Sequence, residues 1–392
     1  MSELKVNSIK GVGASTAAIT VNNSDGTCTA NITNNLSNRN LIINGAMQVA
    51  QRGTSSLGSD EYGSVDRIYH GYNNVDESPT FSQADVASGT TPYTLGFRKC
   101  FKVTNGDQSS GAGTSDKIEF RQRLEAQNIA NSGWNYKSSS SFITLSFWVK
   151  SSVAQNFYFY MLANDGTQQN FPMETGSLSQ DTWTKVTKTI PGNSNVQFDN
   201  DVNEGMTIVW DLFRGTDQTG SVSLNTWAAF SGSARTPDQT QTWYTTDNAT
   251  FEITGIQLEV GSVATDFEHR SYHDELLRCM RYTQKIDTGS NTYRYVGMGN
   301  VDNDGDNNVV LISFKEPFRI TPSSMSTTGS ASDYAVRRDT TKTCTSVPTM
   351  SSASPHYCAV TFTSTGHGWS TGQAVFGFLK TSGSYLIFNA DF

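Results

Sequence analysis

Short runs of alternating apolar and polar residues recur along most of this chain, and this alternation constrains its fold more than any other feature. In ITLSFWVK, Ile143, Leu145, Phe147 and Val149 share one parity. Successive side chains of a β-strand point to opposite faces, so these residues predict one buried face. Similar runs are NFYFYMLA, WTKVTKTI, MTIVWDLF and FEITGIQLEV. Short strands without helices between them predict an antiparallel, jelly-roll-like sandwich over 41–265.

The last of these runs changes parity near its middle. Phe251 and Ile253 share one parity, whereas Ile256 and Leu258 share the other. A β-bulge at Gly255 would return both pairs to one face, because an inserted residue shifts the register and glycine accepts the backbone that a bulge needs. We therefore expect the sandwich to end with this strand.

A helix is predicted directly after the sandwich, within a linker over 266–285. Ser271 and Asp274 have the spacing of a capping box. Leu276, Leu277 and Met280 then repeat at helical spacing. The pattern predicts one short amphipathic helix over about 272 to 285, with an apolar stripe that needs a partner.

Strand patterns resume in YRYVGM, NVVLISF, YCAVTFT, AVFGFL and YLIFNADF, and predict a second, smaller sandwich over 286–392. Residues 1–40 contain brief alternations between Asn/Asp-Gly turns, and such short strands bury little surface alone. We expect this arm to be ordered by partner chains or by an attachment site. The predicted fold class is therefore all-β: two antiparallel sandwiches joined by one short helix, with an extended N-terminal arm.

Charge and hydropathy exclude two classes of partner. The net charge is −8 and no run of Lys and Arg is present, which argues against nucleic acid. The longest apolar runs are far shorter than the ~20 residues that span a bilayer, so membrane insertion is not expected. The N-terminus also lacks the apolar core of a secretory signal, which predicts folding in a cytoplasm.

The five cysteines are scattered and show no zinc-type spacing. Reduced, buried thiols are the default interpretation, a Cys344–Cys358 bridge stays open, and no cofactor is expected.

Two patterns in the sequence have features of metal sites. His269 and His273 have i,i+4 spacing, but His269 precedes the helix, so a structural or surface role is favoured. Asp302, Asp304 and Asp306 place carboxylates at alternate positions, as calcium loops do, yet the rest of the EF-hand pattern is missing. A hairpin tip is the favoured interpretation, and calcium is the weaker one.

No nucleophile elbow or phosphate-binding loop is present. Glu119 and Glu125 lie in KIEFRQRLE with cations of the same parity, and a pair of carboxylates is what glycosidases use. We favour a solvated outer strand face for this row over an active site.

Sugar binding is easier to support, because aromatic rings stack on sugars and polar side chains bind hydroxyls. If the even-numbered face of 144–150 points outward, Trp148 would lie near a row with Tyr158 and Tyr160. Candidates in loops are Trp227, Trp243, Tyr244, His367 and Trp369. The loop STGHGWSTG, with its histidine and tryptophan, is the preferred contact at a tip.

Several blocks resemble a family of bacteriophage tail-fibre and appendage proteins. They are NLIINGAMQVAQRGTS, DRI, RQRLEAQNIA, LSFWVKSS, ITGIQLEVGSVATDFEHRSYHDELLRCMRYTQK, FKEPFRITPS and YLIFNADF. The blocks run from about residue 40 to the C-terminus, and the block beginning ITGIQLEV is the most specific. The resemblance implies a virion protein, usually a homotrimer, with a carbohydrate-binding-like sandwich and a tip domain for host adsorption.

The resulting hypothesis is a non-enzymatic tail-fibre subunit that binds host-surface glycans. The arm would bind a tail or capsid protein, and Leu276, Leu277 and Met280 would be buried between chains at the trimer axis. Two alternatives stay open: a decoration protein of the capsid or tail that binds no receptor, and a capsule depolymerase that uses Glu119 or Glu125.

Overall fold

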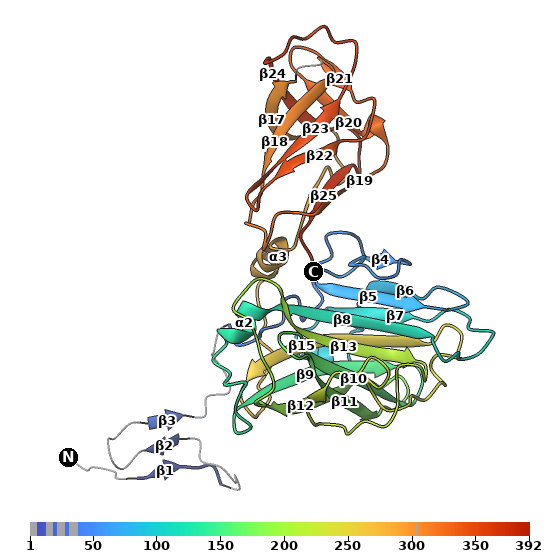
Figure 1. The fold of residues 1–392 in the computed structure, drawn as a ribbon, viewed down its shortest axis with the longest axis vertical. Helices are drawn as coiled ribbons and strands as arrows, with labels where there is room; N and C mark the ends of the chain where they lie inside the picture. The colour runs from blue at the N-terminus through green and yellow to red at the C-terminus, as the bar shows by residue number, and fades with distance from the viewer. Residues whose placement is uncertain (1–5, 13–18, 22–27, 31–37, 303–304) are drawn as a thin grey trace.

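The computed structural model describes residues 6–12, 19–21, 28–30, 38–302 and 305–392, and it confirms the all-β fold class (Figure 1). In the arm, β1 (Ser8–Ile9), β2 (Ile19–Val21) and β3 (Cys28–Ala30) form an antiparallel sheet of their own. Most of the remaining described chain forms a large sandwich followed by a smaller β domain. No helix among the described residues is long and apolar enough to cross a membrane.

Two six-stranded antiparallel sheets form the large sandwich. The first sheet has the order β14 (Ala228–Ala229), β11 (Gln169–Ser177), β10 (Asn156–Ala163), β13 (Glu204–Arg214), β8 (Lys117–Glu125), β5 (Ile68–Asn73). The second has the order β12 (Thr184–Pro191), β9 (Phe142–Ser151), β15 (Thr250–Val260), β7 (Lys99–Thr104), β6 (Thr80–Asp85), β4 (Ser55–Ser56). Two short helices, α1 (Thr91–Thr94) and α2 (Ala126–Ala130), lie in its connections.

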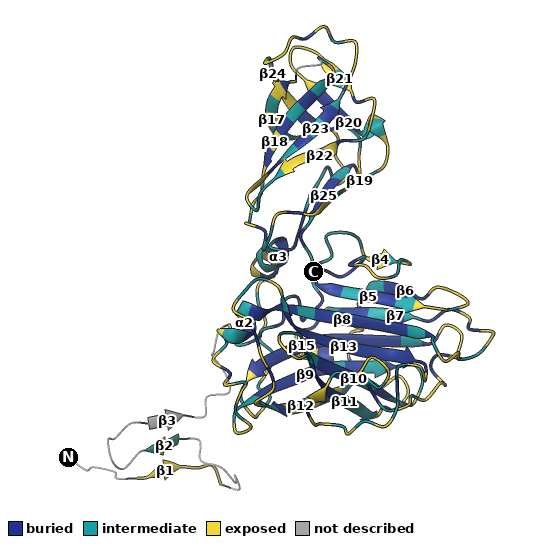
Figure 2. Ribbon diagram, viewed as in Figure 1, coloured by how far each residue is buried: buried dark blue, intermediate teal, exposed yellow. Residues whose placement is uncertain are grey.

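The predicted alternation fills the core between these sheets. Ile143, Leu145, Phe147 and Val149 of β9 are all buried there. Figure 2 shows how buried positions dominate β8, β13 and β15. The bulge is also confirmed, since the β15–β9 register shifts between Thr254 and Gln257.

Helix α3 (Tyr272–Met280) begins where the capping box predicts. The Asp274 N–H donates to Ser271 Oγ at 3.1 Å, and the Ser271 hydroxyl donates to the Asp274 carboxylate at 2.7 Å. The helix ends earlier than predicted, because Thr283 already pairs with Asn389 in a sheet.

The small domain also has two sheets. One contains β16 (Thr283–Asp287), β25 (Tyr385–Asn389) and β19 (Ser324–Thr327). The other has the order β21 (Thr341–Thr343), β20 (Tyr334–Arg337), β24 (Ala374–Leu379), β17 (Arg294–Val301), β18 (Asn307–Ser313), β23 (Tyr357–Thr363), β22 (Thr349–Ala353). A 3₁₀ turn, η1 (Ala331–Asp333), precedes β20. The core of the small domain is separate from that of the sandwich.

A buried ionic junction joins the two domains. The last residues of the chain return to the sandwich, where Arg67 Nη1 lies 3.0 Å from Asp391 Oδ1. The guanidinium of Arg67 also stacks over the Tyr282 ring, 3.5 Å from its centroid. On the same side, Glu125 accepts from Arg281 at 2.7 Å and from the Tyr282 hydroxyl at 2.6 Å. These contacts tie α3, the C-terminal segment and the sandwich together.

The metal and cysteine predictions have different outcomes. The described part of 301–308 forms the predicted tip between β17 and β18, and Asp304 lies outside the described residues. No group of three His, Cys, Asp or Glu side chains that could hold a metal occurs among the described residues. Buried free thiols are confirmed at Cys100, Cys279, Cys344 and Cys358, so the 344–358 bridge is not formed.

Candidate carbohydrate-binding site

Trp148 projects from the outer face of the sheet that contains β9. Its neighbours Phe147 and Val149 point into the core, so Trp148 and Ser146 must point away from it. In the ladder, Trp148 lies directly opposite Lys185 of β12 and Thr254 of β15. The condition set for Trp148 in the sequence, an outward even-numbered face of 144–150, is therefore met at this residue.

The bulge at Gly255 lets an aromatic ring cover this face. Gly255 has φ +65°, a left-handed conformation that glycine adopts without steric cost. A Cβ at this position would lie 2.6 Å from Cζ of Phe97, so only glycine leaves room for that ring. Phe97 comes from the segment between α1 and β7 and is itself buried.

Two further rings complete an aromatic wall. Phe267 and His269 follow β15, and their ring centroids lie 4.9 and 5.1 Å from that of Phe97. The ring nitrogen Nε2 of His269 is hydrogen-bonded to the Leu95 carbonyl at 2.8 Å, which fixes the ring on the segment after α1. The histidine therefore packs in the wall, in agreement with the structural role favoured for it over a metal site shared with His273.

These rings and Trp148 line a cavity of about 240 Å³, called the Trp148 pocket below. Its lining residues are Leu95, Phe97, Ser146, Trp148, Lys185, Gly255, Thr265, Asp266, Phe267 and His269. Trp148 and Phe267 are half-buried, whereas Lys185, Asp266 and His269 are exposed at the rim. The volume lies below the ~300 Å³ lower bound for pockets that hold drug-sized ligands, so it suits a single ring of a longer ligand. Apolar ring faces beside a charged and hydroxylated rim can bind the two sides of a sugar.

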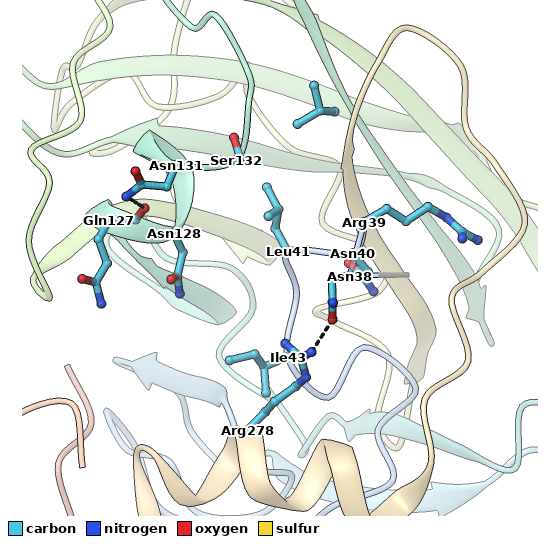
Figure 3. A pocket seen from close by; sticks show the side chains of 11 residues that line it. Asn38, Arg39, Asn40, Leu41, Ile43, Gln127, Asn128, Asn131, Ser132 and Arg278 are labelled. Atoms are coloured by element: carbon cyan, nitrogen blue, oxygen red, sulfur yellow. Dashed lines mark hydrogen bonds between the residues drawn. The ribbon is translucent and has the colours of Figure 1, made fainter. Parts of the chain in front are cut away.

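A larger cleft of about 720 Å³ lies where the chain enters the sandwich (Figure 3). Its lining is rich in amides: Asn38, Asn40, Gln127, Asn128 and Asn131, with Arg39, Leu41, Ile43, Ser132, Val260 and Arg278. Arg278 of α3 donates to Asn38 Oδ1 at 2.7 Å across one side of it. Since no aromatic ring occurs among the described residues that line this cleft, they offer no stacking surface for a sugar.

The predicted row of Trp148 with Tyr158 and Tyr160 is wrong. Strands β9 and β10 are consecutive, but they belong to opposite sheets of the sandwich, so their outward faces lie on opposite sides. Tyr158 is half-buried on its own outer face, and Tyr160 is fully buried. Burial raises the pKa of the Tyr160 hydroxyl to about 12.

The candidates Trp227, Trp243 and Tyr244 are also corrected, because all three are buried in the sandwich core. Each uses its polar atom inside the fold. Trp227 Nε1 donates to the Pro191 carbonyl at 2.7 Å, and Trp243 Nε1 donates to the Thr250 carbonyl at 3.1 Å. The Tyr244 hydroxyl donates to Asp116 at 2.9 Å. Buried rings with satisfied polar atoms are core residues rather than stacking platforms.

The loop with His367 and Trp369 connects β23 to β24. The two rings stack with centroids 4.3 Å apart. Trp369 is buried in the core of the small domain, and its Nε1 donates to Asp339 at 3.2 Å. Trp369 therefore holds the loop in place, and of the two rings only the half-buried His367 is partly accessible.

The expectation that Glu119 and Glu125 lie on a solvated strand face is wrong. Both are fully buried. Glu119 forms ion pairs with Arg214, Arg121 and Lys117, the last at 3.2 Å. Burial raises the pKa of this carboxyl, but the three cations outweigh that effect and hold the pKa at about 2. Glu125 belongs to the domain junction, where hydrogen bonds from Arg281 and Tyr282 outweigh burial and lower its pKa.

The trimer contacts predicted on α3 are only partly accessible. Met280 is buried within its own chain, so it cannot form the stripe that was expected between chains. Leu276 and Leu277 are half-buried.

Sequence reasoning missed Phe97, Phe267 and Lys185 as site residues. The signal that could have found Phe267 is its position shortly after the end of β15, where the chain leaves the sheet. Lys185 could have been found only by pairing β12 with β9, and Phe97 only from the tertiary fold.

Comparisons with known proteins give structural neighbours only. No family model matches the sequence, and no curated protein matches it. The enzymatically active domain of tailspike protein 4 from bacteriophage CBA120 is 10% identical, with a TM-score of 0.31, and the match covers 57% of this chain and 22% of that one. A CBM4 structure is 15% identical, with a TM-score of 0.28, and covers 56% of this chain and 99% of its own. A xylan-binding domain from CBM 22 is 10% identical, with a TM-score of 0.27, and covers 55% and 99%. The match thus spans about a fifth of the tailspike chain.

Proposed function

We propose that this chain is a non-enzymatic, glycan-binding subunit of a bacteriophage virion appendage. The observation that carries the proposal is the Trp148 pocket, where the half-buried rings of Trp148 and Phe267 line a cavity together with Lys185 and Asp266. Sugars present apolar faces to rings and hydroxyls to polar side chains, and this pocket offers both partners side by side.

The absence of catalysis is part of the proposal. A glycosidase needs one carboxylic acid that keeps its proton near neutral pH beside a second, ionised carboxylate. Glu119 and Glu125 are both buried in ion pairs, and their carboxyl pKa values are lowered. Neither is suited to donate a proton to a glycosidic oxygen.

The virion assignment rests on the sequence blocks that resemble phage appendage proteins. In this proposal the chain folds in the host cytoplasm and assembles as a homotrimer. Residues 1–40 attach it to a tail or capsid protein, and the β domains meet the host surface. Several weak pockets would then act together, because linked copies raise the effective affinity through avidity.

Competition for adsorption tests this function. Purified full-length protein should block adsorption of the parent phage to its host, because it occupies the receptor. The Trp148→Ala variant should compete poorly, whereas Trp183→Ala should compete as the unchanged protein does. Trp183 is a matched control, since it belongs to the same apolar cluster as Trp148 and does not line the pocket. If the protein is present on the virion but the purified chain does not block adsorption, it is instead a decoration protein.

A further inference from the structure

The outer face of the seven-stranded sheet in the small domain is unusually apolar. Its inner face is conventional, with Val310, Ile312 and Val360 in the core. On the other side, six large apolar side chains remain between 44% and 59% exposed: Tyr293, Tyr295, Met298, Leu311, Tyr357 and Phe376. They lie on, or next to, the adjacent strands β24, β17, β18 and β23. We call these six residues the apolar face; Figure 2 shows exposed positions on β24.

Strand register brings these side chains together. Met298 of β17 lies directly opposite Leu311 of β18 on one side and Phe376 of β24 on the other. Directly paired residues of antiparallel strands share a face, so these three form the centre of the surface. The Tyr295 ring lies 5.5 Å from that of Phe376, because an irregularity between Tyr295 and Gly297 returns Tyr295 to the same side.

An antiparallel sheet with one solvated face normally carries polar residues there. An aromatic side chain buries ~150–250 Å² when fully covered, so a half-exposed ring leaves roughly 100 Å² in contact with water. Four such rings, with Met298 and Leu311, give about 500 Å² of neighbouring apolar surface, near the top of the ~300–600 Å² range for the largest patch on a monomer, which is often functional. We infer that this face is covered by another surface in the assembled protein.

We propose that the apolar face packs against the same face of further copies of this chain. Around a rotation axis, the residues nearest the axis meet their own counterparts, so a self-contact needs an uncharged centre. Met298, Leu311 and Phe376 carry no charge. Two cations border them: Arg337, directly opposite Phe376, donates to the Tyr295 hydroxyl at 3.2 Å, and Arg294 lies 3.9 Å from the Asp287 carboxylate.

The area of the apolar face is also consistent with an interface to a second copy of the chain. About 500 Å² of apolar surface with a polar rim approaches the ~800 Å² per partner of a standard protein interface. A glycan fits less well, because Met298 and Leu311 at the centre offer no ring on which a sugar could stack. The surface also replaces the contact that the sequence placed on α3, where Met280 is already buried.

The inference deepens the homotrimer part of the proposed function and rests on it, but it does not involve the Trp148 pocket. Light scattering of the full chain after size-exclusion chromatography tests it. The unchanged protein should have three times the mass of one chain at micromolar concentration. Leu311→Lys and Met298→Lys should both reduce the mass to that of one chain, because a lysine at the centre brings like charges together. Val263→Lys, at an exposed apolar residue after β15, should keep the assembled mass.

Circular dichroism and thermal unfolding check that the lysine variants fold. Because the two lysines are at separate positions, one variant still tests the proposal if the other does not fold. The proposal is wrong if the unchanged chain is a monomer, or if folded lysine variants keep the assembled mass. It is also wrong if Phe376→Ala loses glycan binding while the mass is unchanged, because the face would then be a ligand surface.

Measuring glycan binding distinguishes failure of the assembly proposal from failure of the proposed function. A folded, monomeric Leu311→Lys variant should bind a short oligosaccharide as the unchanged chain does, since the pocket lies in the other domain. Its binding to polymeric glycan should weaken through loss of avidity. Assembly without any glycan binding would contradict the proposed function alone.

Discussion

At the scale of single residues, a network of buried charged side chains around Glu119 stabilises the sandwich. Glu119 is surrounded by Arg214, Arg121 and Lys117 inside the fold. Arg214 is bound in turn by Asp211, at 2.7 Å. Removing one member of such a network leaves the others buried and uncompensated, and this typically costs ~3–5 kcal/mol of unfolding free energy.

Glu119→Gln should therefore lower the unfolding free energy by several kcal/mol at neutral pH. The carboxyl pKa is lowered in the folded state to about 2, so its stabilising contribution is present above the unfolded pKa near 4.5 and is lost as the pH falls toward 2. The melting temperatures of variant and unchanged protein should thus converge on acidification.

Melting curves between neutral and strongly acidic pH measure this convergence. Asp85→Asn is the control, because Asp85 pairs with Lys99 on the surface, where an ion pair contributes only ~0–1 kcal/mol. Equal effects of the two substitutions would contradict a buried network.

At the scale of elements, β15 and its bulge connect the fold to the candidate site. The parity change at Gly255 was readable from the sequence, because a period of two leaves no other way to keep Phe251 and Leu258 on one face. The ring that the bulge admits was not readable, since Phe97 is brought there by tertiary contacts. The start of α3 was also readable, because the capping box involves only neighbouring residues. The end of α3 was not, because it depends on the pairing of Thr283 with the distant Asn389.

Gly255→Ala should destabilise the sandwich and weaken glycan binding together. A left-handed non-glycine residue costs ~1–2 kcal/mol, and the new Cβ would also clash with Phe97 in the pocket wall. Gly176→Ala is a matched control, with φ +74° and no atom near the added Cβ. The control should lose stability but retain binding. Thermal unfolding and a glycan titration of both variants measure the difference, and equal loss of binding would argue against the role of Phe97.

At the scale of the whole molecule, the sequence predicted two β domains joined by a helix but not the ionic junction between them. Arg67 and Asp391 are 324 positions apart in the chain, and no local pattern relates them. The same limit explains the errors among the aromatic candidates. Parity says which side of a strand a ring occupies, but only the topology says that β9 and β10 face opposite ways and that Trp243 is covered by the core.

The central claim is that the Trp148 pocket binds glycan, and calorimetric titration of the purified chain with polysaccharide from the host surface tests it most directly. An aromatic anchor contributes ~2 kcal/mol or more, so Trp148→Ala should weaken binding about 30-fold while Trp183→Ala leaves it nearly unchanged. If Trp148→Ala binds as tightly as the unchanged protein, the pocket is not the site.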